Sequence, residues 1–422
     1  MRIAICSLSQ FTYVAECIDV AQRLNEKHEV CYFLGFHCSS AINLLQKKHL
    51  PHQVLNKGLE TASILTSPAT AKSTYDLFKS YFFKYAELVL PDLLKAFKHW
   101  KPDLILSHLR DYTGITAAEI INKPVVSFGS HTSPLRVESI DPPFGSRGSR
   151  DTPKGLFKIW WELHNKFNDK VDKIYNHTIR QPYGLSHVYN TSTLHSDRLV
   201  LLSLISALSN KHSQEPPHIK YVGSLLSRKL DAAPAKEIDL IARISSMPKP
   251  RVFVSLGTTY VTKLLLEKCL KALIPFPGTV IVSLGGKTDL NLPSLLDLPH
   301  IIWNSFFFDV DRVLKLSDVI VTVGGGKSVM DSLSVGKPLI CLPQQGEQWE
   351  IALALQSLGA AEIPCPRKWD GQTFTEVTEQ VATEAKYTEA AALLQSKVEQ
   401  SGGVEEAVKA IEALYKCVDF KL

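Results

Sequence analysis

The sequence lacks the features that mark several specialised classes of protein. It has no run of about 18 apolar residues, so no membrane-spanning helix is expected. None of its 8 cysteines forms a C-x-x-C pair, which argues against a zinc site and for a reducing compartment. The net charge is only +5 and no block of Lys and Arg stands out, so no nucleic-acid partner is expected. The apolar start at residues 1–8 is too short for a signal peptide, and we expect a cytoplasmic protein.

Apolar and charged residues occur in the proportions of an ordinary globular protein. They make up 45% and 21% of the 422 residues, enough for two or three domains of about 100–200 residues each. Short runs rich in Val, Ile and Leu alternate with helical patterns, which predicts doubly wound α/β sheets of parallel strands buried on both faces. The strands are expected at residues 2–8, 29–35, 103–109, 124–130, 187–192, 198–204, 251–257, 279–286, 300–306, 318–324 and 338–343.

A polar stretch divides these strands into two groups. We expect a Rossmann-like N-terminal domain over residues 1–223, a linker over 224–248 and a second α/β domain over 249–405. Residues 406–422 form a helical pattern that we expect to pack back on the first domain. Two such lobes leave a cleft facing the carboxyl ends of their strands, where α/β proteins bind ligands.

Two long helical patterns in the first half carry many aromatic residues. They span 70–98 and 157–180, and the second combines an aromatic side with a side rich in lysine. An aromatic stripe at helical spacing usually packs on a sheet, and we favour that interpretation for both. The alternative for the second pattern is that it lines an apolar substrate pocket or makes a peripheral contact with a membrane.

The stretch VIVTVGGGKSVMDSLSVGKP at residues 319–338 looks at first like a P-loop, but that motif needs a glycine where this chain has Val321. The pattern predicts a strand, a glycine turn and a helix. The first N–H groups of such a helix carry a partial positive charge that suits a diphosphate. Lys327 and Ser328 add a cation and a hydroxyl donor, and Asp331 lies one turn further, placed for a ribose diol. The alternative is a tight turn whose glycines serve packing only.

An acid and an amide follow the next expected strand. Glu347 and Gln348 come shortly after Pro343, where that strand ends. The carboxylate can accept hydrogen bonds from two hydroxyls, while the amide both donates and accepts. The pair therefore suits glucose or a similar hexose. For Glu347 alone, the alternative is an acid placed at a helix N-terminus by the helix dipole.

Together these elements resemble the donor-binding signature of UDP-glycosyltransferases and macrolide glycosyltransferases, which have the GT-B fold. The family pattern is roughly T-H-G-G-x-N-S-x-x-E-A-L-x-x-G-x-P, then a strand, then P-x-x-x-[DE]-Q-x-x-N-A. Asp331 stands where the family has its ribose-binding Glu, and the resemblance is strongest over residues 251–359. The positions that match in register are Thr322, Gly324, Gly325, Ser328, Leu333, Gly336, Pro338, Pro343, Glu347, Gln348, Ala352 and Gly359.

The resemblance implies an inverting transfer of a hexose from a UDP-sugar, or another nucleotide sugar, to a hydroxyl of a small, partly apolar acceptor. It implies no metal and no cofactor, because the UDP-sugar is a substrate. Helix N–H groups and Lys327 would stabilise the charge on the leaving diphosphate. The donor-binding residues that it implies are Ser255, Gly257 and Thr258 near the phosphates, Phe308 and Val310 beside the uracil, and Gly324, Gly325, Gly326, Lys327, Ser328, Asp331, Glu347 and Gln348 along the rest of the donor.

The sequence departs from the family pattern where the family has its catalytic base. The usual catalytic His, just after the first strand, is Tyr13 here, and the acid that orients it is replaced by His108. The candidate bases are Glu16, His108 and Asp111. For Glu16, the alternative is an ordinary acid in the first turn of a helix, whereas a carboxylate at Asp111 would raise the basicity of a nearby imidazole.

The phosphate side departs as well. The family's phosphate-contacting His in T-H-G-G is Val323, and Lys327 at the family's Asn position can replace the lost charge. A nucleotide-sugar-binding protein without transferase activity, or a hydrolysing nucleotide-sugar epimerase, is therefore the alternative to a glycosyltransferase. A Rossmann oxidoreductase is disfavoured, because no G-x-G-x-x-G follows the first strand.

Overall fold

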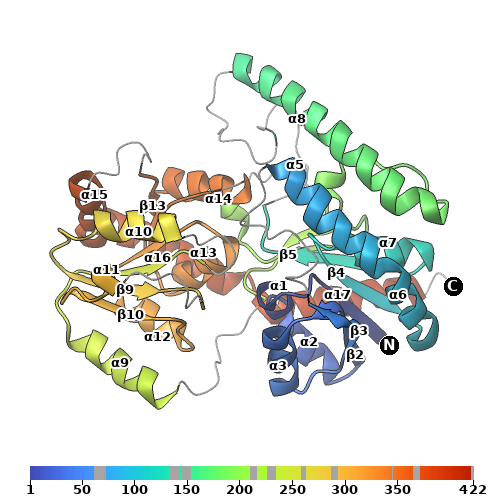
Figure 1. The fold of residues 1–422 in the computed structure, drawn as a ribbon, viewed down its shortest axis with the longest axis horizontal. Coiled ribbons are helices and arrows are strands. Elements are labelled where there is room, and N and C mark those ends of the chain that lie inside the picture. Colours follow the sequence, from blue (N-terminus) through green and yellow to red (C-terminus); the bar gives the residue numbers. More distant parts are fainter. Residues whose placement is uncertain are drawn as a thin grey trace.

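The chain folds into two α/β lobes that lie side by side in a computed structural model (Figure 1). The described strands up to residue 221 form the sheet of the first lobe, and those from residue 251 onward form the sheet of the second. The structure describes residues 1–60, 73–132, 143, 154–209, 216–225, 234–257, 263–286, 293–344, 346–364 and 371–419.

The first lobe is built on a seven-stranded parallel sheet. In spatial order its strands are β3 (His52–Glu60), β2 (Glu29–His37), β1 (Arg2–Cys6), β4 (Leu104–His108), β5 (Val125–Gly129), β6 (Val200–Leu202) and β7 (Ile219–Tyr221). The chain order reverses between β1 and β4, where Ile3 pairs with Val30 on one side and Leu104 on the other. The loops after β1 and β4 therefore open a crevice at the carboxyl ends of the strands.

The second lobe repeats this plan with six parallel strands. In spatial order they are β10 (Ile301–Asn304), β9 (Thr279–Ser283), β8 (Arg251–Ser255), β11 (Val319–Thr322), β12 (Leu339–Cys341) and β13 (Ala361–Glu362). The order reverses between β8 and β11, so the glycine turn after β11 opens on the second crevice. These two sheets confirm the expected pair of doubly wound α/β domains.

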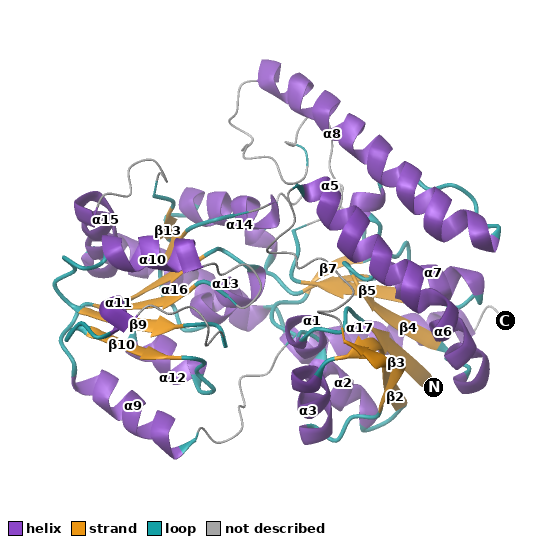
Figure 2. Ribbon diagram, in the orientation of Figure 1, coloured by secondary structure: helices purple, strands orange, loops and turns teal. Residues whose placement is uncertain are grey.

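Helices cover both faces of each sheet (Figure 2). Those of the first lobe are α1 (Phe11–Ala15), α2 (Ile18–Asn25), α3 (Ser39–Lys47), α5 (Thr74–Leu77), α6 (Lys84–Trp100), α7 (Tyr112–Ile120) and α8 (Lys154–Tyr175). The later ones are α9 (Ala235–Ser246), α10 (Lys263–Ala272), α11 (Pro293–Leu296), α12 (Val310–Leu316), α13 (Gly326–Leu333), α14 (Gly346–Ser357), α15 (Gly371–Thr383), α16 (Ala385–Gln400) and α17 (Gly403–Asp419). Among the described residues, none of these helices has the length and hydropathy needed to cross a membrane.

The last helix returns to the first lobe. Helix α17 packs against α2, and its Ile411 is fully buried in the same apolar cluster as Leu24. Ion pairs join the two helices at the surface, as between the guanidinium of Arg23 and Glu405 at 3.1 Å. This contact ties the C-terminal end of the chain to the lobe that holds its N-terminus (Figure 1).

The strand predictions were wrong at the edges of the sheets and in one loop. The structure has no strand over residues 187–192 and forms only a short 3₁₀ turn at Thr191–Thr193. Strands β3, β7 and β13 were missed, and each is an edge strand. An edge strand need not be buried on both faces, so it lacks the continuous apolar run on which the predictions relied.

The helical predictions differ in detail. The pattern over 70–98 is interrupted by a π-helical segment, Phe78–Phe83, between α5 and α6. Part of the expected linker, 224–248, is ordered as α9, whose Ile241 and Ile244 are buried against the second sheet. Pro234 directly precedes that helix, and the apolar residues of the helix recur at helical spacing. The sequence therefore indicated a helix here, although the stretch is polar overall.

Candidate active site

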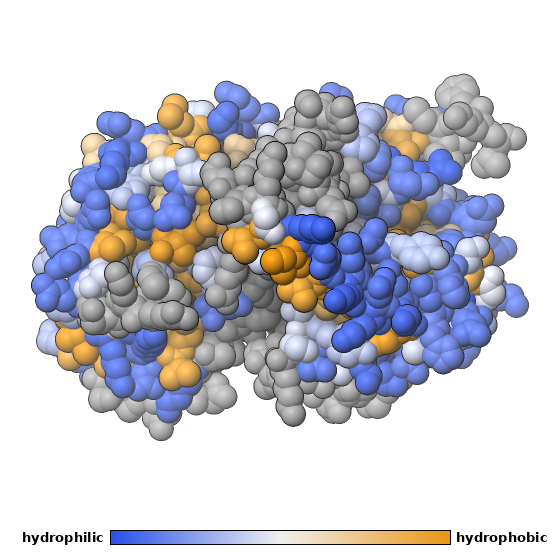
Figure 3. Space-filling view, turned by 90° about the horizontal axis from the view of Figure 1, so that it is seen from above, coloured by the Kyte–Doolittle hydropathy of each residue, from blue (hydrophilic) through white to orange (hydrophobic). Residues whose placement is uncertain are grey.

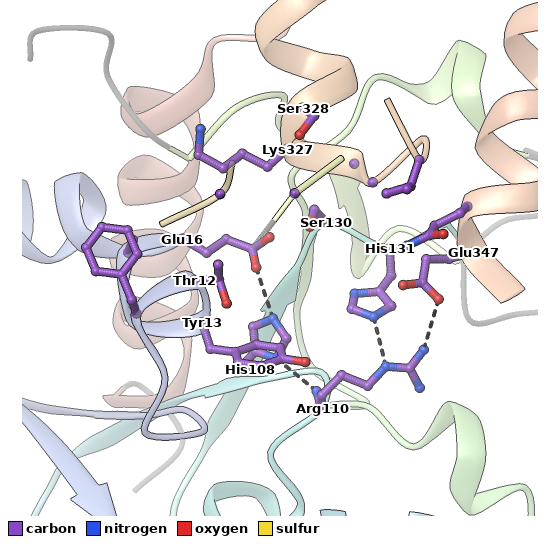
Figure 4. A pocket seen from close by; sticks show the side chains of 18 of the residues that line it. Thr12, Tyr13, Glu16, His108, Arg110, Ser130, His131, Lys327, Ser328 and Glu347 are labelled. Carbon is purple, nitrogen blue, oxygen red and sulfur yellow. Dashed lines mark hydrogen bonds and ion pairs between the residues drawn. The ribbon is translucent and has the colours of Figure 1, made fainter. Parts of the chain in front are cut away.

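A cavity of about 1140 Å³ lies between the lobes, and both of them line it. The residues come from the carboxyl ends of the central strands, where each sheet reverses its order. Contacts close to the cavity join the lobes: Arg110 after β4 lies 3.6 Å from Glu347 of α14, and Thr132 donates to Glu350. The cavity is therefore a site shared by the two halves of the chain (Figure 4).

The glycine turn forms the floor of the cavity on the second lobe. Gly324 has a left-handed φ of 82°, which favours glycine, and the turn leads into α13 at Gly326. A Cβ atom on Gly326 would lie 2.6 Å from the backbone oxygen of Ser130 in the first lobe. The absence of that side chain thus lets the lobes meet closely beside the N-terminal N–H groups of α13, which line the cavity with Gly325.

Two charged side chains at this helix are paired with each other. The ammonium of Lys327 lies 2.5 Å from the carboxylate of Asp331, one turn further along α13. Both residues line the cavity, as does Ser328. The expected cation and ribose acid therefore stand side by side, and a bound nucleotide would share or separate this pair.

Glu347 and Gln348 both reach the cavity from the first turn of α14. Gln348 is buried, and its side-chain oxygen accepts a hydrogen bond from the N–H of Gln344 at 2.9 Å. That bond leaves the amide NH₂ group as the part of Gln348 that can face a ligand. Glu347 faces Arg110 across the cleft, so a sugar in this corner would lie beside an acid and a guanidinium.

The remaining expected donor residues lie on the opposite wall of the second lobe. Ser255, Gly257, Phe308 and Val310 line the cavity, whereas Thr258 lies outside the described residues. The N–H of Phe308 is taken up by the carboxylate of Glu237 in α9 at 3.0 Å. A nucleobase at this turn would therefore contact the exposed Phe308 ring or other backbone groups.

The first lobe contributes an acid paired with a histidine. Glu16 lies between α1 and α2, and its Oε2 atom is 3.0 Å from Nε2 of His108 at the end of β4. Its other oxygen accepts a hydrogen bond from the hydroxyl of Ser203 at 2.9 Å. Both Glu16 and His108 line the cavity, and Figure 4 shows the carboxylate directed toward the imidazole. Glu16 is therefore not an acid in the first turn of a helix. The residues around it in the sequence did not predict its contact with His108.

The hydrogen bonds of His108 determine its tautomer. Its Nδ1 accepts the backbone N–H of Arg110 at 3.0 Å, so this nitrogen carries no proton. Nε2 then carries the proton and donates it to Glu16. With both nitrogens engaged in this way, the imidazole has no free lone pair with which to take a proton from a substrate. The arrangement leaves the carboxylate of Glu16 as the proton acceptor of the pair.

Burial alone would raise the pKa of Glu16, but the hydrogen bonds that it accepts lower it. Donors at His108, Ser203 and Ser130 lower the pKa below its ordinary value. The group is therefore ionised at neutral pH. A carboxylate held in this state can accept a proton from a substrate hydroxyl whose acidity increases during a reaction.

Asp111, the third candidate base, is placed elsewhere. Its side chain is buried and accepts the N–H of Thr113 at 3.0 Å, which makes it the N-cap of α7. It does not line the cavity within the part of the chain that the structure describes. Burial raises the pKa of this carboxyl, against the hydrogen bonds that lower it. The expected His108–Asp111 pair is replaced by His108–Glu16, because Asp111 caps a helix instead.

The sequence analysis did not identify two residues of the cavity, Arg110 and His131. Nε of Arg110 donates to Nε2 of His131 at 2.9 Å, and both residues line the cavity. Burial and the neighbouring Arg110 hold the pKa of His131 well below its ordinary value, so the ring is neutral. Its Nδ1 has no hydrogen-bond partner among the described residues. Their only sequence signal was a polar residue just after a buried strand.

One end of the cavity is apolar. The π-helical segment supplies Phe78 and Phe82, and α8 supplies Trp160, Leu163 and Phe167. The second half of α8 packs on the first lobe, where Tyr175 is fully buried. Helix α8 therefore both packs on the first lobe, as favoured from the sequence, and lines an apolar part of the cavity. Residues 133–153 lie outside the described part of the chain except for Pro143.

Comparison with known proteins agrees with these features. Residues 279–407 match the glycosyltransferase family 28 C-terminal domain. The chain is 24% identical over 335 residues to the NDP-glycosyltransferase YjiC of Bacillus subtilis, covering 78% of this chain and 76% of that protein. It is 25% identical over 167 residues to the demethyllactenocin mycarosyltransferase of Streptomyces fradiae, covering 39% of this chain and 36% of that one.

Solved structures share the whole architecture. The glycotransferase of kitacinnamycin aligns with a TM-score of 0.75 at 17% identity, covering 98% of this chain and 99% of its own. At this identity the likeness shows the fold. Together with the sequence matches, it supports a glycosyltransferase. In sequence the chain resembles the UDP-glycosyltransferases and macrolide glycosyltransferases; it has the GT-B fold, with a glycosyltransferase family 28 C-terminal domain over residues 279–407.

Proposed function

We propose that this protein is an inverting, metal-independent glycosyltransferase that moves a hexose from a UDP-sugar to a hydroxyl of an apolar acceptor. The observation that carries the proposal is the carboxylate of Glu16, held by His108 in the same cavity as the N-terminus of α13. A proton acceptor and a diphosphate site in one cleft are the two groups that such a transfer requires.

In this mechanism Glu16 is the general base. The acceptor hydroxyl gives its proton to the Glu16 carboxylate while its oxygen forms a bond to C1 of the sugar. The bond between C1 and the diphosphate oxygen breaks, and its electron pair leaves with UDP. His108 does not take the proton, since its Nε2–H holds Glu16 in place. Because attack and departure occur on opposite faces of C1, the anomeric configuration inverts.

The second lobe stabilises the leaving group. Charge grows on the diphosphate as the C1–O bond breaks, and the N–H groups at the start of α13 are fixed dipoles that face the cavity. Lys327 adds a full positive charge when its pairing with Asp331 gives way to the ligand. These groups stabilise the negative charge of the leaving diphosphate, as a divalent cation does in other phosphate-transferring enzymes, so the transfer needs no metal.

The corner between Glu347 and Arg110 suits the sugar, and the aromatic end suits the acceptor. Glu347 and the amide of Gln348 offer acceptors and donors for hexose hydroxyls. Phe78, Phe82 and Trp160 offer flat apolar surface to a ring-containing acceptor.

The decisive experiment is turnover of UDP-glucose with a panel of phenolic, sterol and macrolide acceptors. We expect UDP release with an acceptor present, a glycoside by mass spectrometry, and a β-linkage by proton NMR from the α-linked donor. An α-linked product would contradict inversion, and loss of activity in EDTA would contradict metal independence. A UDP-induced rise in melting temperature without turnover across the panel would favour a nucleotide-sugar-binding protein instead.

A further inference from the structure

The first half of α8 exposes an unusual amount of apolar surface. Leu156, Ile159 and Leu163 have exposed fractions of 44%, 53% and 59%. Their spacing of three and four residues puts them on one side of the helix. On the opposite side of the helix, Trp161 is only 8% exposed. In Figure 1 this helix runs along the outer edge of the molecule.

Lysines continue the same stripe toward the helix C-terminus. At 100° per residue, the six side chains Leu156, Ile159, Leu163, Lys166, Lys170 and Lys173 lie within an arc of about 100°. The lysines are exposed, and none has an ion-pair partner within the described residues. The acids of the helix, Glu162, Asp169 and Asp172, lie outside this arc. From above, Figure 3 shows apolar side chains gathered beside a hydrophilic band on this side of the molecule.

We propose that this stripe docks the protein on the surface of an anionic lipid bilayer. An interfacial helix combines an apolar segment that enters the acyl boundary with lysines that contact acidic headgroups. The segment from Leu156 to Leu163 is only about 11 Å long, so it enters one leaflet as a wedge. The three exposed lysines of the stripe then face the phosphates.

The charge pattern favours a membrane over a second copy of the chain. Two copies paired antiparallel in full overlap would set the lysine half of one stripe over the apolar half of the other. Two copies paired parallel would set lysine against lysine, which is repulsive. An anionic bilayer can contact both halves of the stripe, because its acyl region takes up the apolar residues and its negative headgroups attract the lysines.

Docking would also present the cavity to the lipid. Leu163 belongs to the stripe and lines the cavity as well, together with its neighbours Trp160 and Phe167. The aromatic end of the cavity therefore opens at the docked helix. If the proposed function holds, on which this step alone rests, the acceptor is a hydroxylated lipid or a ring compound dissolved in the bilayer.

The test is sedimentation of the full chain with vesicles, without any nucleotide sugar, so its outcome is independent of transferase activity. We compare vesicles of phosphatidylcholine alone with vesicles containing about one third phosphatidylserine. We expect at least tenfold stronger partition onto the acidic vesicles, weakened by salt. Equal binding to both, or none to either, would overturn the proposal.

Two variants and two matched controls localise the contact. The triple change Leu156→Ser, Ile159→Ser, Leu163→Ser and the double change Lys166→Glu, Lys170→Glu should each reduce partition at least tenfold. The apolar control is Leu264→Ser with Leu393→Ser, which are 76% and 70% exposed elsewhere. The charge control is Lys397→Glu with Lys416→Glu. Each variant's melting curve is measured to verify folding. Equal losses in controls and variants, or a dimer abolished by the triple change, would refute membrane docking.

Discussion

Replacing Glu16 by Gln tests the proposed base with the smallest change of shape. The amide keeps the size of the side chain, and its oxygen can still accept the hydrogen bond from His108 Nε2, which is 3.0 Å long in the unmodified protein. It cannot take a proton from the acceptor hydroxyl. A positioned general base contributes about 10² to 10⁴ in rate. The transition state should therefore rise by about 3 to 5 kcal/mol relative to the bound substrates.

The assay is UDP release at saturating UDP-sugar and acceptor, with binding followed by the melting temperature. We expect kcat to fall by about 10² to 10⁴ while UDP still raises the melting temperature as in the unmodified protein. Asp19→Asn is the control, because it removes a carboxylate from the same wall of the cavity. Retention of more than about a tenth of the rate in Glu16→Gln would refute the assignment of the base.

The pH profile separates Glu16 from His108 as the base. The base acts only when deprotonated, and hydrogen bonds hold the pKa of Glu16 below its ordinary value despite burial. Activity should therefore stay level through neutral pH and fall only below about pH 4.5. In His108→Phe the strongest donor is gone while burial remains, so the pKa rises and the acid limb moves to higher pH. A limb near about 6.5 in the unmodified protein would point to a histidine base.

Three further changes probe the donor site and the helix cap. Lys327→Met should weaken UDP binding about tenfold or more in calorimetry, the worth of a charge-assisted hydrogen bond of about 1.5–3 kcal/mol; unchanged affinity would mean that Lys327 serves only Asp331. Asp331→Ala should abolish the UDP-induced rise in melting temperature, and a normal rise would remove it from the ribose site. Asp111→Ala should cost about 1 kcal/mol of unfolding free energy through loss of the N-cap, with kcat unchanged; a large loss of kcat at normal stability would return Asp111 to the catalytic group.

The cavity residues of the second lobe could be predicted because they are close in sequence. The glycine turn, Lys327, Asp331 and the Glu347–Gln348 pair lie within one strand–helix–strand–helix unit, where spacing alone fixes their neighbourhood. All of them line the cavity except Gly324, whose left-handed turn shapes it. Local pattern carries such a site, since strand ends and helix starts in a parallel sheet meet at one edge.

The cavity residues of the first lobe depend on contacts between distant parts of the chain. Glu16 and His108 are 92 residues apart and meet only because β1 and β4 are neighbours at the point where strand order reverses. Arg110 and Glu347 meet only because the lobes face each other. The positions of strands can be predicted from a sequence more readily than the order in which the strands pair in the sheet. The short edge strands, β7 and β13 among them, escaped for a related reason, since edge positions relax the apolar pattern.

The departures from the family pattern make sense together once the geometry is known. In the family pattern a histidine follows the first strand and an acid lies at the end of the fourth. Here Tyr13 stands at the histidine position, the acid Glu16 follows three residues later, and His108 stands where the family has its acid, so acid and histidine are exchanged between the two strand ends. The exchange puts an anionic base in the cavity that is to hold an anionic diphosphate. Val323 offers no donor there, but Lys327 brings a full positive charge into that cavity. We infer that the lysine offsets the added carboxylate, so the double change Glu16→His, Lys327→Asn should bind UDP better than Lys327→Asn alone.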